Sequence, residues 1–585
     1  MTGAGPDTTP VLSVVVPCFR QQDVIAENLR EIVARVETIG VPFEVVLVSD
    51  GSPDDTVQQA TTVDDPRIRV LAYDRNMGKG YAVRTGSFAA RGEWVAWVDS
   101  DLDLDPSLLG RFLHQAEHEH LDVVVGSKRH PESIVDYPFK RRVYSWLYQR
   151  LVKAMFGLDI RDTQVGLKLF RRRVLEEVLP VVLVKRYAFD LEILAVARSF
   201  GIDRIAEAPV RLDYRFSGTG MNWRAIAQAL WDTAAVFYRL RLLGYYNQRR
   251  VLGHRLAVHR PAVLPTVTVV VAPGSSGHDG SGADLDAILD QLPDAVPVVA
   301  IAPPALRAAL DRPGRVLLVE SEPDGEREAA ARAACAATTD LVGFIDLGAR
   351  PTSYWLDAAL PLFGDPLIGA VAGPTVPLLT GDLQRDATGV LSESRLGMGG
   401  ARVRHHVGGV REVGDFPLSN LFVRTESVRD LTRAGVPLDD QFITALRQRL
   451  GMTVLCSPDV VVTSLPPRLW SQHLHRLLRL ARHRGRIAGP SAPLRMRHLA
   501  PLAWTMTVAL GPLALAHGGR LRRAWIAIAL TYLAVLAWFA ALIGILHRRP
   551  RLGLHAALGA AASHLIVGIG LILGRLRRLR DRLRL

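Results

Sequence analysis

The stretch RNMGKGYAVRTGSFAARGEWVAWVDSDLDLDP, residues 75–106, indicates how the first part of the chain folds. It reads as a glycine-rich loop, a helix, a turn and then a strand over residues 94–98 that delivers Asp99 and Asp101 at its end. Ligands of open α/β sheets collect beyond the carboxyl ends of the strands. Two carboxylates there suit a hard divalent cation whose other oxygen ligands come from a diphosphate. The stretch therefore predicts a metal and diphosphate site, with a solvated turn as the alternative.

Three continuous apolar runs, typical of buried parallel strands, lie before this stretch or lead into it. They cover residues 11–17, 43–48 and 68–72. Segments with helical periodicity separate them, and strands that alternate with helices predict a doubly wound, mostly parallel sheet of the α/β class. In such a sheet Pro17, Asp50 and Asp99 fall on one rim.

Six motifs follow one another in the first part of the chain: PCFRQQDVI, VSDGSPDDT, NMGKGYAVRTG, VDSDLDLDP, DTQVGLKLFRR and AFDLEILAVARSFGIDRIAEAPVRLDYR. In this order they resemble the family 2 glycosyltransferases, and within them the dolichyl-phosphate glucosyltransferase and polyprenyl-phosphate sugar synthase group. The resemblance covers about residues 10–245. It implies a GT-A type, Rossmann-like sheet, inverting transfer from a nucleotide sugar, and Mg²⁺ or Mn²⁺. The sequence departs from the family at Cys18-Phe19-Arg20 and at Ser49, which replaces the first of two acidic residues.

The resemblance also implies roles for single residues. Asp99 and Asp101 are the metal ligands, and Asp101 is also counted as catalytic because the metal neutralises the departing diphosphate. Asp162 is the carboxylate nearest the acceptor and the second catalytic candidate. A hydroxyl acceptor needs a base there, whereas a lipid phosphate is already an anion and needs mainly cationic guidance. The residues expected to bind donor or acceptor are Pro17, Asp50, Gly78, Lys79, Arg84, Lys128, Arg129 and Lys168.

Within that set, similar enzymes give the position of Asp50 the task of accepting a hydrogen bond from a uracil imide. Its structural alternative is a turn or a helix cap. Lys79 and Arg84 are expected at the diphosphate or the sugar. Lys128, Arg129 and Lys168 are expected at the phosphate of the acceptor.

A chain of 585 residues needs more than one core. After a catalytic domain over residues 1–250 and a linker over 251–264, a second βα series over 265–490 resembles a diverged, membrane-bound family 2 glycosyltransferase, so the GT-A fold is expected in two tandem copies. Gly348 stands where the second metal Asp would be, and PGSSGHDGSG replaces the donor loop. Asp439 or Asp440 matches the usual catalytic acid position. We expect this copy to be weak or silent.

The last part, residues 491–585, carries apolar segments at 499–516, 525–546 and 552–574 and an Arg-rich tail. Transmembrane helices are expected here, with two spans and the first segment re-entrant or interfacial because Gly511-Pro512 breaks it. From Arg468 onward the chain has 20 Arg, no Lys and one acidic residue, and this excess lies between apolar runs. Such an arrangement fits membrane lipids and excludes nucleic acid as the partner. The basic, aromatic stretches at 138–156 and 223–246 are expected as interfacial helices, with plain core helices as the alternative.

We therefore expect an enzyme that moves a hexose, glucose from UDP-glucose, onto polyprenyl phosphate at the cytoplasmic face of the membrane. The runner-up is a membrane glycosyltransferase that elongates a glycolipid or polysaccharide on a hydroxyl, with the second domain also catalytic. A sugar-phosphate nucleotidyltransferase would need an amino-terminal glycine-rich signature that this chain lacks, and a scaffold role suits residues 265–490 better than the first domain. The sequence leaves a homo-oligomer open. The first residues lack the order of a signal peptide, so the first domain is expected in the cytoplasm.

Overall fold

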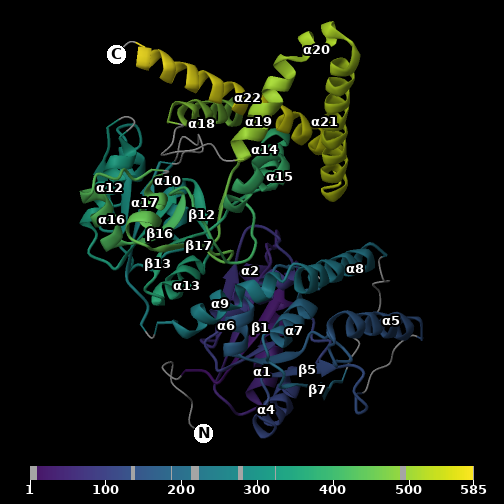
Figure 1. The fold of residues 1–585 in the computed structure, drawn as a ribbon. Coiled ribbons are helices and arrows are strands. Elements are labelled where there is room, and N and C mark those ends of the chain that lie inside the picture. The colour runs from purple at the N-terminus through teal and green to yellow at the C-terminus, as the bar shows by residue number, and fades with distance from the viewer. Residues whose placement is uncertain are drawn as a thin grey trace.

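The computed structural model describes residues 9–133, 139–185, 188–211, 223–261, 263–273, 281–322, 325–439, 441–487 and 496–583. Two α/β domains follow one another along the chain, and a group of long helices lies beyond the second (Figure 1). The two sheets and the carboxyl-terminal helices agree with the predicted fold class.

The first sheet has seven strands in the order β3-β2-β1-β4-β6-β5-β7. All neighbouring pairs are parallel except those of β6, which runs antiparallel to β4 and β5. The strands are β1 Leu12–Cys18, β2 Phe43–Ser49, β3 Ile68–Ala72, β4 Trp94–Trp97, β5 Val123–Ser127, β6 Lys168–Arg171 and β7 Ile205–Pro209.

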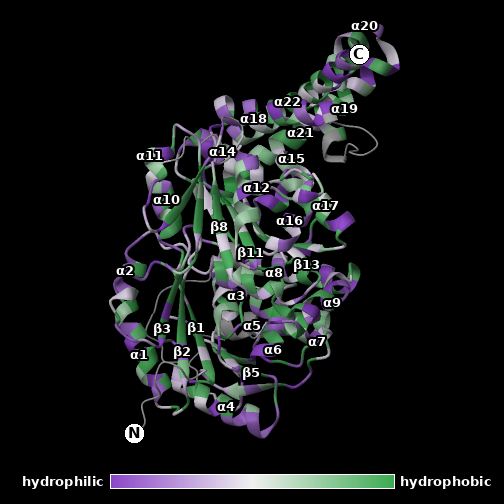
Figure 2. Ribbon diagram, turned by 90° about the vertical axis from the view of Figure 1, so that its left-hand side faces the viewer, coloured by the Kyte–Doolittle hydropathy of each residue, from purple (hydrophilic) through white to green (hydrophobic). Residues whose placement is uncertain are grey.

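Helices cover both faces of this sheet, which is why its central strands are apolar without interruption. Val14 and Val16 of β1 belong to one apolar core, and Val15 belongs to the core on the other face. Figure 2 shows the same hydrophobic colour along β1 and β2. The helices are α1 Ile25–Glu37, α2 Thr56–Thr61, α3 Lys79–Ala89, α4 Leu109–His118, α5 Phe139–Phe156, α6 Arg172–Val178, α7 Phe189–Ser199, α8 Trp223–Phe237 and α9 Tyr245–Val258. Because α9 extends to Val258, much of the expected linker over 251–264 is helical.

Two of these helices present large apolar side chains to the outside. Trp146 of α5 is 48% exposed and Trp231 of α8 is 74% exposed, although Phe156 and Val236 on the same helices are buried. Exposed indole rings of this kind fit the surface of a membrane better than the surface of a soluble domain, and α5 is also basic.

The second sheet repeats the order of the first. Its strands run β10-β9-β8-β11-β16-β13-β17-β15, and β16 is antiparallel to both β11 and β13, as β6 is to its neighbours. The strands are β8 Val267–Ala272, β9 Val298–Ala302, β10 Val316–Glu320, β11 Leu341–Asp346, β13 Ile368–Ala372, β15 Arg411–Glu412, β16 Asn420–Arg424 and β17 Thr453–Cys456, and a small sheet adds β12 Ala349–Pro351, β14 Thr375–Pro377 and β18 Val462–Ser464. The shared topology confirms two tandem copies of one fold.

Three helices of the second domain, α14, α15 and α18, contact α22 of the carboxyl-terminal group. The helices are α10 Gly282–Leu289, α11 Arg307–Leu310, α12 Glu326–Ala336, α13 Trp355–Ala359, α14 Leu383–Glu393, α15 Arg395–Met398, α16 Thr425–Arg433, α17 Phe442–Arg449 and α18 Leu474–Ile487.

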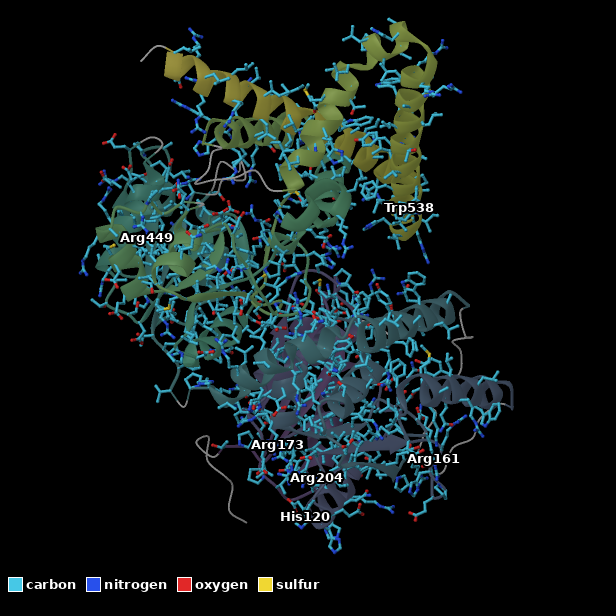
Figure 3. All side chains as sticks on the ribbon, in the orientation of Figure 1. His120, Arg161, Arg173, Arg204, Arg449 and Trp538 are labelled. Atoms are coloured by element: carbon cyan, nitrogen blue, oxygen red, sulfur yellow. The ribbon has the colours of Figure 1, made fainter. Side chains whose placement is uncertain are left out.

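Two helices of the last part are long and apolar enough to cross a membrane: α21 Gly519–Leu546 and, within α22 Pro550–Leu583, residues 550–581. The first apolar segment forms α19 Met496–Ala509 and α20 Gly511–His517, bent by 47° at the expected break. Trp538 of α21 is 66% exposed and labelled in Figure 3. Only 17% of the most apolar 18-residue segment of α21 is buried, against 44% of the corresponding segment of α22, which packs along α18. Arg549, at the turn between them, pairs with Asp386 of α14, so this turn lies beside the second domain.

Candidate functional site

Asp99 and Asp101 follow β4 at its carboxyl end, as predicted. The strand is buried between β1 and β6, so the chain just beyond it reaches the rim of the sheet. Lys79, the first residue of α3, forms an ion pair with Asp99 across this rim. Gly166 lies against the same carboxylate, since a Cβ added there would be 2.2 Å from Asp99 Oδ2. The site therefore needs a glycine at 166 to leave room for Asp99.

The two carboxylates have opposite electrostatic surroundings. Burial raises the pKa of Asp99, but Lys79, Lys168 and Lys128 outweigh it and the pKa is lowered overall. Burial also raises the pKa of Asp101, and the charge of Asp99 raises it further. A divalent cation would relieve this repulsion, and carboxylate oxygens are its usual ligands, so the pair fits Mg²⁺ or Mn²⁺. Within the residues described, no group of three or more His, Cys, Asp or Glu gathers as a metal site. The remaining ligands would have to come from a bound substrate or water.

Asp50 fixes the loop that carries Lys79. Its Oδ1 accepts hydrogen bonds from the Tyr73 hydroxyl at 2.9 Å and from the Met77 amide at 2.7 Å, and its Oδ2 accepts one from Gly78 N at 2.9 Å. Gly78 has a φ of 101°, a conformation that favours glycine. These contacts resemble the structural alternative, with Asp50 holding a neighbouring turn, and a contact with a base stays a prediction. Pro17, buried and paired with Val48, is the last residue but one of β1.

Asp162 lies in the loop before β6, among the same charges. Burial raises its pKa, while Lys128 and Lys168 act in the opposite direction. Its Oδ1 accepts a hydrogen bond from Gln164 N at 3.2 Å. Lys128 directly follows β5, and its neighbour Arg129 donates to the side chain of Gln149 on α5. Two of the three predicted acceptor cations, Lys128 and Lys168, therefore lie near Asp162.

Lys168 is held more firmly than the sequence suggested. Its side chain is fully buried, its Nζ donates to Asp190 Oδ1 at 2.6 Å and to the Val165 carbonyl, and the ammonium lies 5.8 Å from the Trp97 ring centroid. The antiparallel register that pairs Trp97 with Lys168 places it under the rim. Asp190, in the first turn of α7, is the residue that sequence reasoning missed, although the motif AFDLEI contains it.

Arg84 lies apart from this group. It comes five residues after Lys79 on α3, which turns it by about 140° around the helix axis. Its guanidinium is buried and forms a two-fold ion pair with Asp459 of the second domain. It also donates to the main-chain carbonyls of Leu179 and Val182. Because its donors face the domain interface, we leave Arg84 out of the substrate site proposed below.

The second domain also contacts the first turns of α3 and the donor loop, which is the loop between β3 and α3, residues 73–78. The Tyr81 hydroxyl donates to the Pro458 carbonyl at 3.0 Å. Asp74 accepts a hydrogen bond from the Thr463 hydroxyl at 2.8 Å. Arg75 pairs with Glu393 of α14 at 2.9 Å. The loop between β3 and α3 is therefore fixed by Asp50 within the first domain and by contacts with the second domain.

The second domain keeps one half of the carboxylate pair. Asp346 ends β11 at the position that Asp99 takes after β4, and Gly348 takes the place of Asp101. Asp346 interacts electrostatically with Arg476 of α18. Asp439 is half-buried and accepts a hydrogen bond from Gln441 N, and Asp440 lies outside the described residues.

Comparison with known proteins finds one family model, glycosyl transferase family 2, over residues 13–179. Among similar proteins, glycosyltransferase AglD of Haloferax volcanii is 32% identical over 203 residues, which cover 34% of this chain and 32% of that protein. Human dolichyl-phosphate beta-glucosyltransferase is 32% identical over 218 residues, which cover 34% of this chain and 67% of that protein. Dodecaprenyl-phosphate galacturonate synthase of Rhizobium johnstonii is 28% identical over 170 residues, 28% of this chain and 49% of that protein.

Among solved structures, glucosyl-3-phosphoglycerate synthase from Mycobacterium tuberculosis, in complex with Mn²⁺, UDP and phosphoglyceric acid, matches with a TM-score of 0.31 and 20% identity. The match covers 39% of this chain and 78% of that one. All of the sequence matches described above concern about a third of the chain, and the chain spans between a third and two thirds of the length of those relatives.

Proposed function

Because this chain belongs to glycosyl transferase family 2 through its amino-terminal domain, we propose that the enzyme transfers a hexose, with inversion, from a nucleotide sugar to polyprenyl phosphate. The observation that carries the proposal is the single charged cluster at the rim of the first sheet. There the Asp99 and Asp101 pair and Lys79 stand on one side, and Asp162 with Lys128 stands on the other. A diphosphate and a phosphate could be held side by side in such a cluster.

The donor side of the cluster fits a nucleotide diphosphate. Lys79 opens an eleven-residue helix, so an anion at this point meets both its ammonium and the helix amino terminus. Asp99 and Asp101 would hold Mg²⁺ or Mn²⁺, which supplies positive charge to the departing diphosphate. Glucose from UDP-glucose is the donor we propose, since several relatives are named dolichyl-phosphate beta-glucosyltransferases. Pro17 and Asp50 border the place where the base would lie.

The acceptor side fits an anion. The second pKa of a phosphate monoester is about 6, so a phosphate oxygen is a nucleophile at neutral pH without a base. Lys128 and Arg129 are the cations proposed to guide it. Lys168 is already paired with Asp190 and is proposed to fix the segment below the acceptor phosphate. Asp162 is proposed to orient these cations and the sugar.

A hydroxyl acceptor is the second candidate, and one observation favours it. Burial raises the pKa of Asp162, which brings a carboxylate closer to the range of a general base. With a hydroxyl, Asp162 would have to remove the proton as the bond to the anomeric carbon forms.

We propose that the reaction takes place at the cytoplasmic face. The turn between α21 and α22, with Arg548, Arg549 and Arg551, lies beside the second domain. The end of α22 contacts the second domain as well, since Asp581 pairs with Arg486 of α18. Arg-rich segments stay preferentially on the cytoplasmic side of a membrane, which would put both α/β domains there.

The test is a transfer assay with membranes that contain the full-length chain. Radiolabelled UDP-glucose, UDP-galactose, UDP-glucuronic acid and GDP-mannose are offered in turn, and lipids are extracted. We expect UDP-glucose to label a lipid from which mild acid releases the sugar, because a glycosyl phosphate is acid-labile whereas an ordinary glycoside is stable. An acid-stable lipid product would establish the hydroxyl acceptor instead. Membranes with Asp101→Asn serve as the control for other transferases.

A further inference from the structure

A second cationic cluster lies between the two α/β domains, away from Asp99. It joins the end of the donor loop and the segment before α7 of the first domain to α15 and the loop after it in the second domain. Its cations are Arg75, Lys185, Arg395, Arg402 and Arg411, and Glu393 is the carboxylate among them. His406 lies among them as a neutral imidazole, because burial and these cations lower its pKa.

The main chain shows how these segments come together. Val410 N donates to the Pro180 carbonyl at 2.9 Å, and a Cβ on Gly409 would lie 2.9 Å from Leu183. The loop that carries His406 and Arg411 therefore rests on the segment that leads to Lys185. The main-chain carbonyl of Lys185 accepts a hydrogen bond from Tyr81 N at 3.3 Å. This bond joins the cluster to the amino-terminal turn of α3, two residues after Lys79.

The positive charges exceed what the protein supplies to balance them. Glu393 is already paired with Arg75 at 2.9 Å. Among the residues described, no carboxylate forms an ion pair with Lys185, Arg395 or Arg402. The Nε atoms of Arg402 and Arg411 are buried without a hydrogen-bond partner in the described chain. Burial lowers the pKa of Lys185 to about 7, and the neighbouring Arg75 and Arg402 lower it as well, against Glu393.

Like charges brought together out of water are costly unless an anion offsets them. The cluster is half-buried, and Arg395 at its border is exposed, so a small anion can reach it from outside. The membrane part of the chain contacts the helices beside the cluster: His564 of α22 contacts the Leu396 carbonyl at 2.8 Å, and Arg549 pairs with Asp386 of α14. Because the membrane helices lie on that side, a lipid headgroup is the anion that we assign to the cluster.

We infer that this cluster binds the phosphomonoester headgroup of a membrane lipid beside the amino-terminal turn of α3, outside the place proposed above for the reacting phosphate. A monoester carries about −1.5 to −2 charges at neutral pH, which suits several cations better than a singly charged diester does. The inference rests on the proposed function in one respect, since polyprenyl phosphate is the phosphomonoester lipid that the proposed reaction consumes. Phosphatidic acid has the same headgroup on another lipid.

The test measures binding and not transfer. Full-length protein in detergent is titrated with a radiolabelled short-chain prenyl phosphate, and separately floated with phosphatidylcholine vesicles that contain phosphatidic acid. The variants are Arg402→Gln, Lys185→Gln and Glu393→Gln. The matched control is Arg449→Gln, an exposed arginine on α17 of the same domain (Figure 3). Thermal unfolding of each variant is recorded alongside.

We expect Arg402→Gln and Lys185→Gln each to weaken prenyl phosphate binding about tenfold, the usual effect of losing one charge-assisted hydrogen bond. Glu393→Gln should tighten binding, because it removes the competing carboxylate, and a folding defect cannot produce a gain. Arg449→Gln should bind like the wild type. In transfer assays, Arg402→Gln should raise the KM for prenyl phosphate and leave the KM for UDP-glucose unchanged.

If the variants weaken the binding of both lipids, the protein recognises the headgroup alone. If they weaken the binding of prenyl phosphate only, the protein recognises the prenyl tail as well. Either result supports the inference. Equal binding of both lipids by wild type, Arg402→Gln and Lys185→Gln would overturn it, whether or not the enzyme transfers glucose. Absence of transfer by the wild type, with binding still dependent on Arg402, would instead reject the proposed function and keep the lipid site.

Discussion

Arg84 of the first domain and Asp459 of the second form a two-fold ion pair, with both Nε to Oδ1 and Nη2 to Oδ2 at 2.9 Å. Each side chain is 5% exposed. The pair ties the middle of α3 to the second domain, and the first residue of that helix is Lys79, which contacts Asp99. The second domain therefore bears directly on the geometry of the proposed donor site, although its own carboxylate pair is incomplete.

Breaking this pair should destabilise the protein. Removal of one partner of a buried ion pair typically costs about 3–5 kcal/mol, because the other charge stays buried without compensation. We expect Asp459→Ala to lower the free energy of unfolding by that order, and Arg84→Ala to do the same. Chemical denaturation of the detergent-solubilised protein measures both. If the double variant is no less stable than wild type while each single variant is, the pair itself accounts for the effect.

A fragment of residues 1–259, which keeps α9 whole, tests whether the first domain needs the second. Without residue 459 the guanidinium of Arg84 would lose its partner, and Tyr81 would lose the Pro458 carbonyl. We expect the fragment to unfold at a lower temperature than the full chain and to transfer poorly. Arg84→Met in the fragment should recover part of the stability, since it removes the unpaired charge and keeps most of the side-chain volume. A fragment with wild-type stability and turnover would show that the interface has no role in the site.

Asp99→Asn and Asp101→Asn should each abolish most transfer by removing a metal ligand. We expect a loss on the order of 10²–10³ or more in kcat, the range seen when one electrostatic stabiliser of a transition state is removed. EDTA should silence the wild-type enzyme, and Mg²⁺ or Mn²⁺ should restore it. The unfolding temperature of Asp101→Asn should stay near that of wild type, because burial and Asp99 already raise the pKa of this carboxyl. Full activity in EDTA would argue against a metal.

Gly166→Ala probes the position of Asp99 without touching a charge. The added methyl would lie 2.2 Å from Asp99 Oδ2, so the carboxylate has to move. We expect kcat to fall at least tenfold, since displacement of a reacting group by about 1 Å can cost a factor of ~10². The control is Gly110→Ala on α4, where the nearest atom to the new Cβ belongs to Ile39 at 3.4 Å and the backbone is helical. Transfer assays on both variants decide whether the effect is specific.

Asp162→Asn distinguishes the two acceptors. With a phosphate acceptor we expect a modest loss, because no proton has to be removed, and the dependence of rate on the second ionisation of the phosphate, near about pH 6, should remain in the variant. With a hydroxyl acceptor the base is worth roughly 10²–10⁴ in rate. Activity would then rise with pH through the raised pKa of Asp162, because only the ionised form accepts a proton, and this limb would vanish in the variant. The pH profile of kcat at saturating substrates is the measurement.

Much of this protein could be predicted from local pattern. The alternation of apolar strands with helices gave both sheets, because strand and helix periods are set by the nearest few residues. Asp99 and Asp346 fall at the ends of β4 and β11 for the same reason. The break before Pro512 appears as the bend between α19 and α20. Hydropathy alone marked α21 and α22 as helices long enough to cross a membrane.

The tertiary structure decided which of the candidate side chains can meet a substrate. Arg84 and Asp459 are 375 positions apart, and no spacing in the sequence links them. Lys168 is engaged by Asp190, and Asp50 by the loop that follows β3, because strand register and loop closure bring these segments together. Local sequence determines which face of a helix or strand a side chain occupies. What covers that face, and so whether a charge stays available for a ligand, depends on contacts that form only when distant segments, within one domain or in both, are folded and packed against each other.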